Sequence, residues 1–189
     1  SLAGAREAGT QLTRNECVAM AINLLFAGHD TTRFLLSAGI ASLVRHPESI
    51  DQVRGNLDLV PGTVEEMLRF EPPVLGSLRA PSESVDFEGV ELRRGTPIHF
   101  LFPGGNRDPR AFDAPDRFDP TRAGPRPLAF GLGSHFCLGA GLARVEAQEV
   151  LRVLLECTSR IELMRTPKMV PYATIRRLES GLGMRLDPT

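Results

Sequence analysis

One cysteine in a glycine-rich stretch is the residue of this chain best placed to do chemistry. Residues 130–140 surround Cys137 with Gly131, Gly133 and Gly139. The first two glycines allow backbone conformations that other residues rarely adopt, and Gly139 would let a flat group approach closely. A helical pattern begins directly afterwards, so the N–H groups of its first turn are expected to face the sulfur and favour the thiolate. A thiolate can bind a metal or attack an electrophile, whereas a buried structural cysteine is the alternative.

The order of residues in this stretch, Phe-x-x-Gly-x-x-x-Cys-x-Gly, resembles the haem-ligand loop of the cytochrome P-450 family. In that family the cysteine thiolate is the proximal ligand of the haem iron and pushes electron density toward the O–O bond. The resemblance implies that Cys137 binds the iron of haem b, iron protoporphyrin IX. Phe130, Gly131 and Gly139 would belong to the cofactor-binding loop, and His135 would bond a haem propionate.

A long helix is predicted over residues 12–45. Thr13 and Glu16 form a capping box at its start, and almost every side of the helix that follows is apolar. About 30 residues at 1.5 Å each make a rod of roughly 45–50 Å. A compact domain of this chain length is only about 40 Å across. The helix is therefore expected to be buried on nearly all sides and to cross a larger protein.

Residues 27–32, Ala-Gly-His-Asp-Thr-Thr, interrupt this helix with poor helix formers and a charge. A purely structural interpretation is that the threonine bonds back to the preceding turn. The segment also resembles the oxygen-binding motif of the same family. The resemblance implies that Ala27 and Gly28 border the groove where dioxygen sits. Thr31 would hydrogen-bond the activated oxygen, and Asp30 would relay protons from solvent.

A second helix, residues 61–70, carries Glu66 and Arg69 at i, i+3. Such a pair is usually a weak surface ion pair. Here it resembles the Glu-x-x-Arg motif of the family, which is a buried structural pair that supports the haem loop. By that resemblance Arg117 would be its third partner, from a Pro-, Asp- and Arg-rich meander at residues 103–129.

The remaining segments are predicted to be short strands and one further helix: strands at 74–80, 85–92 with a turn at Gly89, and 96–102, a helix at 141–157, and a closing hairpin in the last 30 residues. In the family, an arginine in the first strand bonds a haem propionate. Arg79 is assigned this role beside His135, because two cations suit two carboxylates. Val74, Leu75 and Gly76 would lie beside the substrate pocket.

The expected fold is mainly α with small β-sheets. Residues 1–189 are predicted to form a single partial cytochrome P-450 domain of the soluble bacterial type, corresponding to the C-terminal half of the family's catalytic domain. By this resemblance, the N-terminal half, which lines much of the substrate pocket in the family, is expected to be absent from residues 1–189.

The composition excludes several classes of function. The 22 basic and 23 acidic residues nearly balance, so no surface for nucleic acid is indicated. No apolar run is long enough to cross a bilayer, and no membrane anchor is expected. The cysteines at 17, 137 and 157 have no paired spacing, which is typical of a reducing, cytoplasmic setting.

The resemblance implies a haem-thiolate monooxygenase that inserts one atom of dioxygen into a small organic substrate. Electrons would come from a separate ferredoxin- or flavodoxin-type donor, since no nucleotide-binding glycine fingerprint is present. Two alternatives stay open. One is a truncated, non-catalytic haem-binding remnant or one half of a split protein. The other is a metal site without haem, built on His135 and Cys137.

Overall fold

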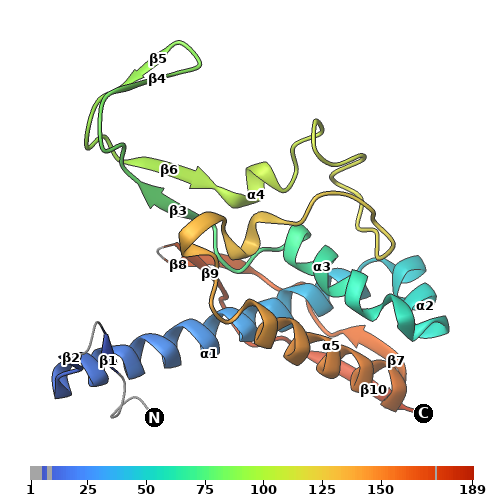
Figure 1. The fold of residues 1–189 in the computed structure, drawn as a ribbon. Coiled ribbons are helices and arrows are strands. Elements are labelled where there is room, and N and C mark those ends of the chain that lie inside the picture. The colour runs from blue at the N-terminus through green and yellow to red at the C-terminus, as the bar shows by residue number, and fades with distance from the viewer. Residues whose placement is uncertain (1–5, 8–9, 173) are drawn as a thin grey trace.

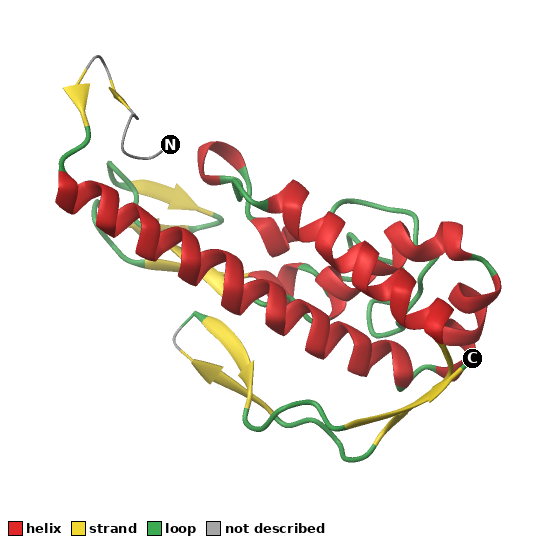
Figure 2. Cartoon of the chain, turned by 90° about the horizontal axis from the view of Figure 1, so that it is seen from below, coloured by secondary structure: helices red, strands yellow, loops and turns green. Residues whose placement is uncertain are grey.

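The computed structural model describes residues 6–7, 10–172 and 174–189. Residues 1–5, 8–9 and 173 of the predicted 1–189 domain lie outside the described part. The helices form one body, and short antiparallel strand pairs lie around its margin (Figures 1 and 2). The longer helices are α1 (Arg14–Val44), α2 (Pro47–Gly55), α3 (Val60–Phe70) and α5 (Ala140–Cys157). The predicted fold class, mainly α with small sheets, is confirmed.

The long helix α1 begins with the predicted capping box. Thr13 Oγ1 accepts a hydrogen bond from the Glu16 backbone N–H at 3.3 Å, and Glu16 Oε2 accepts one from the Thr13 N–H at 2.8 Å. The backbone and hydroxyl hydrogen bonds from Thr13 lower the pKa of Glu16. Both donors that the cap satisfies are groups that a helix start otherwise leaves unpaired.

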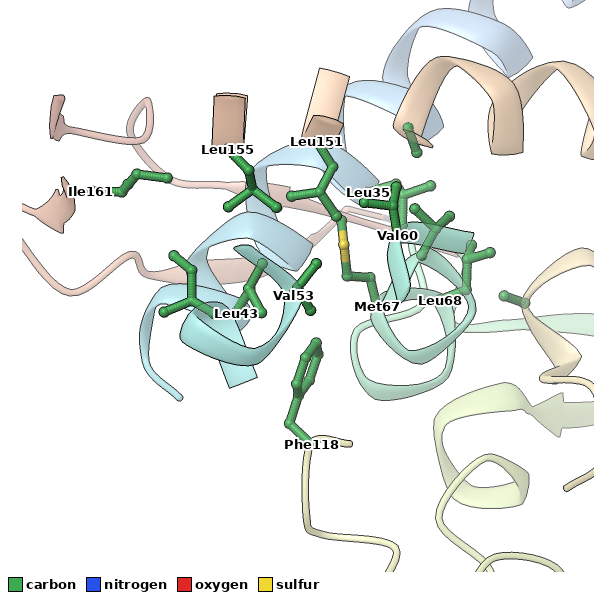
Figure 3. Packing of buried hydrophobic residues seen from close by; sticks show 14 residues of the cluster. Leu35, Leu43, Val53, Val60, Met67, Leu68, Phe118, Leu151, Leu155 and Ile161 are labelled. Carbon is green, nitrogen blue, oxygen red and sulfur yellow. The ribbon is translucent and has the colours of Figure 1, made fainter. Parts of the chain in front are cut away.

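The hydrophobic core lies where the second half of α1 packs against α3 and α5. Leu35, Leu43, Met67, Leu68 and Leu151 are each at most 2% exposed (Figure 3). The two helices α1 and α3 approach closely because Gly39 has no side chain. A Cβ at that position would lie 2.1 Å from Met67 Cε.

The first half of α1 is not covered, contrary to the expectation of burial along its whole length. Figure 1 shows it extending beyond α3 and α5. Its large apolar side chains are between 41% and 73% exposed: Val18, Met20, Ile22, Leu24, Leu25 and Phe26. The buried residues of α1 all lie in its second half, from Phe34 onward. None of the helices in the described part of the chain combines the length and apolarity needed to cross a membrane.

Two strand pairs follow α3. Strand β3 (Gly76–Arg79) pairs with β6 (Ile98–Leu101), and β4 (Val85–Phe87) pairs with β5 (Val90–Leu92) in a hairpin that projects from the body (Figure 1). The hairpin turns at Glu88 and Gly89, whose φ angles are 50° and 83°. These positive angles match a tight hairpin turn and confirm the turn predicted at Gly89. Two two-residue strands, β1 (Arg6–Glu7) and β2 (Thr10–Gln11), precede α1.

The predicted single closing hairpin is wrong. Strand β7 (Thr158–Leu163) pairs with β10 (Met184–Pro188), and a second pair, β8 (Met169–Tyr172) with β9 (Ile175–Leu178), lies between them in the sequence. The reason is local, because turn-forming residues at 166–167 and 180–183 interrupt the apolar alternation on both sides of the inner pair.

The predicted meander joins β6 to the cysteine loop with little regular structure. It starts with the single turn α4 (Phe102–Gly105) and ends in the short 3-10 helix η3 (Leu128–Phe130). Two more 3-10 turns are η2 (Leu57–Leu59), before α3, and η4 (Gly133–His135), before Cys137.

Candidate functional site

A cavity of about 270 Å³ lies between α1 and the cysteine loop. Ala27, Thr31 and Leu35 form one wall, because side chains four residues apart lie on the same face of a helix. The opposite wall includes Cys137. The remaining lining comes from α1, α3, α5 and β3 and from the segments next to β3 and the cysteine: Thr32, Leu68, Pro73, Val74, Gly76, Ser77, Arg79, Phe102, Ala129, Phe130, Gly131, His135 and Ala143.

The cysteine loop is shaped by glycine, as predicted. Gly131 and Gly133 have φ angles of 70° and 72°, in the region that favours glycine. The Cys137 N–H donates to the Phe130 carbonyl oxygen at 3.0 Å, which closes the loop. Cys137 is an exposed free thiol, so the buried structural cysteine is not what the structure has.

Helix α5 begins at Ala140, three residues after Cys137. The cysteine therefore lies before the helix start rather than in its first turn, and its carbonyl oxygen accepts from the Ala140 N–H at 3.3 Å. Gly139 is the residue at the N-cap, and a Cβ there would meet no atom within 4 Å. Gly139 is not among the cavity-lining residues, but the space beside it is open.

Two residues predicted to bond carboxylates, Arg79 and His135, reach the same cavity as Cys137. Arg79 comes from β3, and His135 comes from the turn before the cysteine. Both side chains are exposed. Within the described residues the Arg79 guanidinium donates only to its neighbours, the Ser77 hydroxyl and the Leu78 carbonyl oxygen at 2.8 Å.

The motif on α1 divides between two faces of the helix. Thr31 Oγ1 donates to the Ala27 carbonyl oxygen at 2.6 Å, and its side chain lies on the wall of the cavity. The structural interpretation of this threonine is therefore confirmed, and its side chain also lines the cavity. Asp30 lies on another face, where it pairs with Arg33 at 3.3 Å and lines a separate cavity of about 420 Å³.

The structure does not bring every predicted residue to the Cys137 cavity. Asp30 lies off the face that carries Ala27 and Thr31, since each residue turns an α-helix by about 100°. The same rotation puts Gly28 on the side of the helix that carries Leu35, but Gly28 has no side chain and is not among the cavity-lining residues. Leu75 also points elsewhere, because successive side chains of an extended segment point to opposite sides. Its neighbours Val74 and Gly76 do line the cavity.

The Glu66–Arg69 pair is buried, with both side chains 2% exposed. Arg69 Nε donates to Glu66 Oε2 at 2.7 Å and its terminal nitrogen donates to Oε1 at 2.8 Å. The third member of the cluster is a second cation, Arg122, whose Nε lies 3.1 and 3.2 Å from the two carboxylate oxygens. Both oxygens of this buried carboxylate therefore accept charge-assisted hydrogen bonds from arginine.

The assignment of Arg117 as the third partner is wrong. Its side chain is exposed, and it contributes only its carbonyl oxygen, which accepts from Arg69 at 3.1 Å and from Arg122 at 2.7 Å. The next residue, Phe118, is 1% exposed and takes the inward position, so the Arg117 side chain points out. Sequence reasoning missed Arg122. It lies three residues after Asp119, whose N–H also donates to Glu66 Oε1 at 2.8 Å.

A buried asparagine connects the charge cluster to the cysteine loop. Asn106 is 0% exposed, and its side-chain amide donates to the Arg69 carbonyl oxygen at 3.2 Å. Its Oδ1 accepts from the Leu128 N–H at 2.7 Å, at the start of the turn that leads to Phe130. The meander is therefore a polar bridge between α3 and the loop that carries Cys137.

Other cavity residues had weaker signals in the sequence. Thr32 and Leu35 could have been found from the periodicity of α1, while Phe102 and Ala143 come from distant elements that only folding brings near. The metal-site alternative has no support, because no group of three or more His, Cys, Asp or Glu side chains gathers in the described part of the chain.

Comparisons with known proteins agree with this geometry. The family model described as Cytochrome P-450 matches residues 2–168. The biotin biosynthesis cytochrome P-450 of Bacillus subtilis is 43% identical over 146 residues, which is 77% of this chain and 37% of that protein. The cytochrome P-450 monooxygenase PikC of Streptomyces venezuelae is 43% identical over 151 residues, 79% of this chain and 36% of that protein.

The structure of the cytochrome P-450 CYP109Q5 from Chondromyces apiculatus superimposes with a TM-score of 0.91 and 35% identity. The superposition covers 100% of this chain and 49% of the CYP109Q5 chain. The chain thus spans less than half the length of these relatives, which are bacterial proteins. The fold, the cysteine loop and the sequence matches lead to one conclusion: the chain belongs to the cytochrome P-450 family.

Proposed function

We propose that this chain supplies the haem-thiolate part of a monooxygenase that inserts one atom of dioxygen into a small organic substrate. The observation that carries the proposal is that one cavity is lined by the Cys137 thiol, the Thr31 hydroxyl and the basic side chains of Arg79 and His135. The site fits haem b by the chemistry of its donors. A thiol can ligate the iron, two cations can bind two propionates, and apolar side chains such as Leu35 can contact the ring.

When bound, haem with a thiolate ligand supplies the reductive activation of dioxygen. The chain's own residues then have separable tasks. Cys137 holds the cofactor from the glycine-shaped loop, together with Phe130 and Gly131. Arg79 and His135 orient it by binding its carboxylates at the cavity edge, and the open space beside Gly139 leaves room for a flat ring.

Proton delivery is assigned to Thr31 and Asp30. The Thr31 hydroxyl holds a proton at the cavity wall, where it now donates to the Ala27 carbonyl oxygen. Asp30 faces the other cavity and is held by Arg33 at 3.3 Å. A proton from solvent would reach Thr31 if the carboxylate of Asp30 left Arg33 and turned toward Thr31, which requires rotation of the half-buried Asp30 side chain away from the exposed Arg33.

The substrate is assigned to the side of the cavity where Val74 and Gly76 lie. Electrons are assigned to a separate ferredoxin- or flavodoxin-type donor. A second candidate function is a non-catalytic haem-binding remnant or half of a split protein. The exposed apolar half of α1 favours it, because a catalytic site of this kind needs a covered, water-poor pocket.

The test is reconstitution of the chain with hemin, followed by reduction with dithionite under carbon monoxide. The expected result is a thiolate-type Soret band that disappears in Cys137→Ala and persists in Cys157→Ala, which removes another exposed cysteine. A thiolate-type band that survives in Cys137→Ala would refute the ligand assignment. Haem binding without turnover, even with substrate and an electron donor, would favour the remnant.

A further inference from the structure

A second ion pair on α3 points toward the cysteine loop. The Glu65 carboxylate accepts two hydrogen bonds from the Arg144 guanidinium. Nε donates to Oε1, and a terminal nitrogen donates to Oε2 at 3.2 Å. The side chains are 24% exposed for Arg144 and 34% exposed for Glu65. The pair joins α3 to the second turn of α5.

The same guanidinium contacts both ends of the loop that contains Cys137. Its central carbon lies 4.5 Å from the centroid of the Phe130 ring, at the start of the loop. Another of its nitrogens donates to the Ala140 carbonyl oxygen at 3.4 Å, at the end of the loop. Arg144 is therefore a brace across the loop.

Phe130 connects Arg144 to the cysteine. Its carbonyl oxygen accepts the Cys137 N–H at 3.0 Å. Its ring also packs edge-on against Phe136, the residue before the cysteine, with ring centroids 6.3 Å apart. A displacement of Phe130 would therefore move both the backbone and the neighbour of Cys137.

Adjacent carboxylates on α3 thus hold different parts of the site. Glu66 binds Arg69 and Arg122 and fixes the meander, whereas Glu65 binds Arg144 and fixes the cysteine loop. Neighbouring residues of a helix point about 100° apart, which allows one helix to serve both. The Glu65 contact is independent of the buried cluster.

We propose that Glu65 and Arg144 are positioning residues that set the place of Cys137 through Phe130. The role rests on the proposed function in so far as Cys137 is a haem ligand. The role of Arg144 needs the planar guanidinium of arginine, which can pair with a carboxylate through two hydrogen bonds and stack on an aromatic ring at the same time. Lysine can do neither in the same geometry.

The experiment compares Arg144→Lys, Arg144→Gln and Glu65→Gln with the control Arg152→Gln. Arg152 is on the same helix and makes no ion pair within the described residues. Without haem, amide hydrogen exchange of the Cys137 N–H is measured. The expected result is exchange at least about tenfold faster in the three variants, including the charge-conserving Arg144→Lys, with no change in the control and with the exchange of Leu151 on α5 unchanged.

With haem, the fraction of thiolate-type against thiol-type carbon monoxide complex is measured at one pH. It should fall in the three variants and stay at the parental value in Arg152→Gln. A parental fraction together with parental Cys137 exchange in Arg144→Lys and Glu65→Gln would overturn the inference. If the parent itself gives no thiolate-type band, the proposed function fails, and the haem-free exchange still decides whether the brace exists.

Discussion

Thr31 and Cys137 are the reactive side chains that reach one cavity from opposite walls. The hydroxyl of Thr31 is already engaged with the Ala27 carbonyl oxygen, so its proton is held at a fixed place rather than rotating freely. The thiol of Cys137 is exposed and placed by a glycine turn. Each group is therefore positioned by its own backbone, and their separation depends on how α1 packs.

Thr31→Ala is expected to uncouple turnover rather than abolish it, in a catalytic domain assembled around this chain. Without the hydroxyl, protons are misdirected and reducing equivalents are lost as peroxide. Product per electron should fall several-fold, and Thr31→Ser should restore most of it because the hydroxyl is kept. Substrate product and hydrogen peroxide are measured against electrons consumed. Equal product per electron in Thr31→Ala and parent would contradict the role.

At the scale of elements, α3 is the part from which the meander and the cysteine loop are held. Its buried carboxylate Glu66 is surrounded by donors from Arg69, Arg122 and the Asp119 backbone. A buried charge that loses a partner costs several kcal/mol, which makes this cluster structural rather than catalytic. Predictions at this scale concern folding stability.

Arg122→Ala should destabilise the fold more than Arg117→Ala. The Arg122 side chain is 11% exposed and pairs with Glu66, so its loss should reduce the free energy of unfolding by about 1–3 kcal/mol. Arg117 acts through its backbone carbonyl, which alanine keeps, so its change should stay within about 0.5 kcal/mol. Denaturant unfolding of both variants measures the difference. Equal losses would restore Arg117 as a side-chain partner.

The meander should also become less stable in acid. Partial burial raises the pKa of Asp119, but hydrogen bonds from the Thr121 hydroxyl and N–H, with the charges of Arg117 and Arg122, outweigh it and hold the pKa below its ordinary value. A lowered folded pKa gives stability that is present above the ordinary value of about 3.9 and is lost as pH falls through the folded value.

Unfolding midpoints of the parent and Asp119→Asn are therefore expected to differ most above about pH 5 and to converge as the pH falls below about 4. Asp113→Asn, which removes another carboxylate of the meander from an exposed position, is measured beside it as the control. A gap between parent and Asp119→Asn that is constant across this range would show that the carboxylate charge is not what stabilises the meander.

At the scale of the whole molecule, the uncovered first half of α1 places several exposed apolar side chains on the surface. Its apolar residues spread around the helix, so they cannot all pack against the helices present here. An exposed apolar patch on a monomer is typically no larger than about 300–600 Å², and larger ones promote association. The surface of this chain is therefore suited to contact with another protein surface.

The isolated chain is expected to self-associate and to bind a hydrophobic dye. Replacing Ile22 and Leu25 together by Lys should lower the dye signal and shift the chain toward monomer in sedimentation. Val153→Lys, which changes a residue of similar exposure on α5, should leave both unchanged. A parent that sediments as a monomer with little dye fluorescence would show that this face is compatible with a free chain.

Features set by neighbouring residues could be predicted from the sequence, and features set by distant contacts could not. The start of α1 follows from Thr13 and Glu16, and the loop around Cys137 follows from its glycines. Arg122 lies 56 residues from Glu66, and Arg144 lies 79 residues from Glu65. Nothing in the local pattern says which of several arginines meets a given carboxylate, because the meander and α5 must first fold onto α3. The family resemblance gave the type of cluster but not its third member.

The absence of a side chain at Gly39 sets the distance between α1 and α3 where the two helices cross. Leu35 of α1 and Leu68 of α3 both line the Cys137 cavity, and each lies next to the crossing on its own helix. A methyl group at position 39 would press on Met67 and separate the two helices, with the displacement carried along α1 to the face that holds Thr31. The absence of a side chain at Gly39 thus sets the width of the Cys137 cavity. A substitution there, far from any reactive group, would change which molecules the cavity can hold.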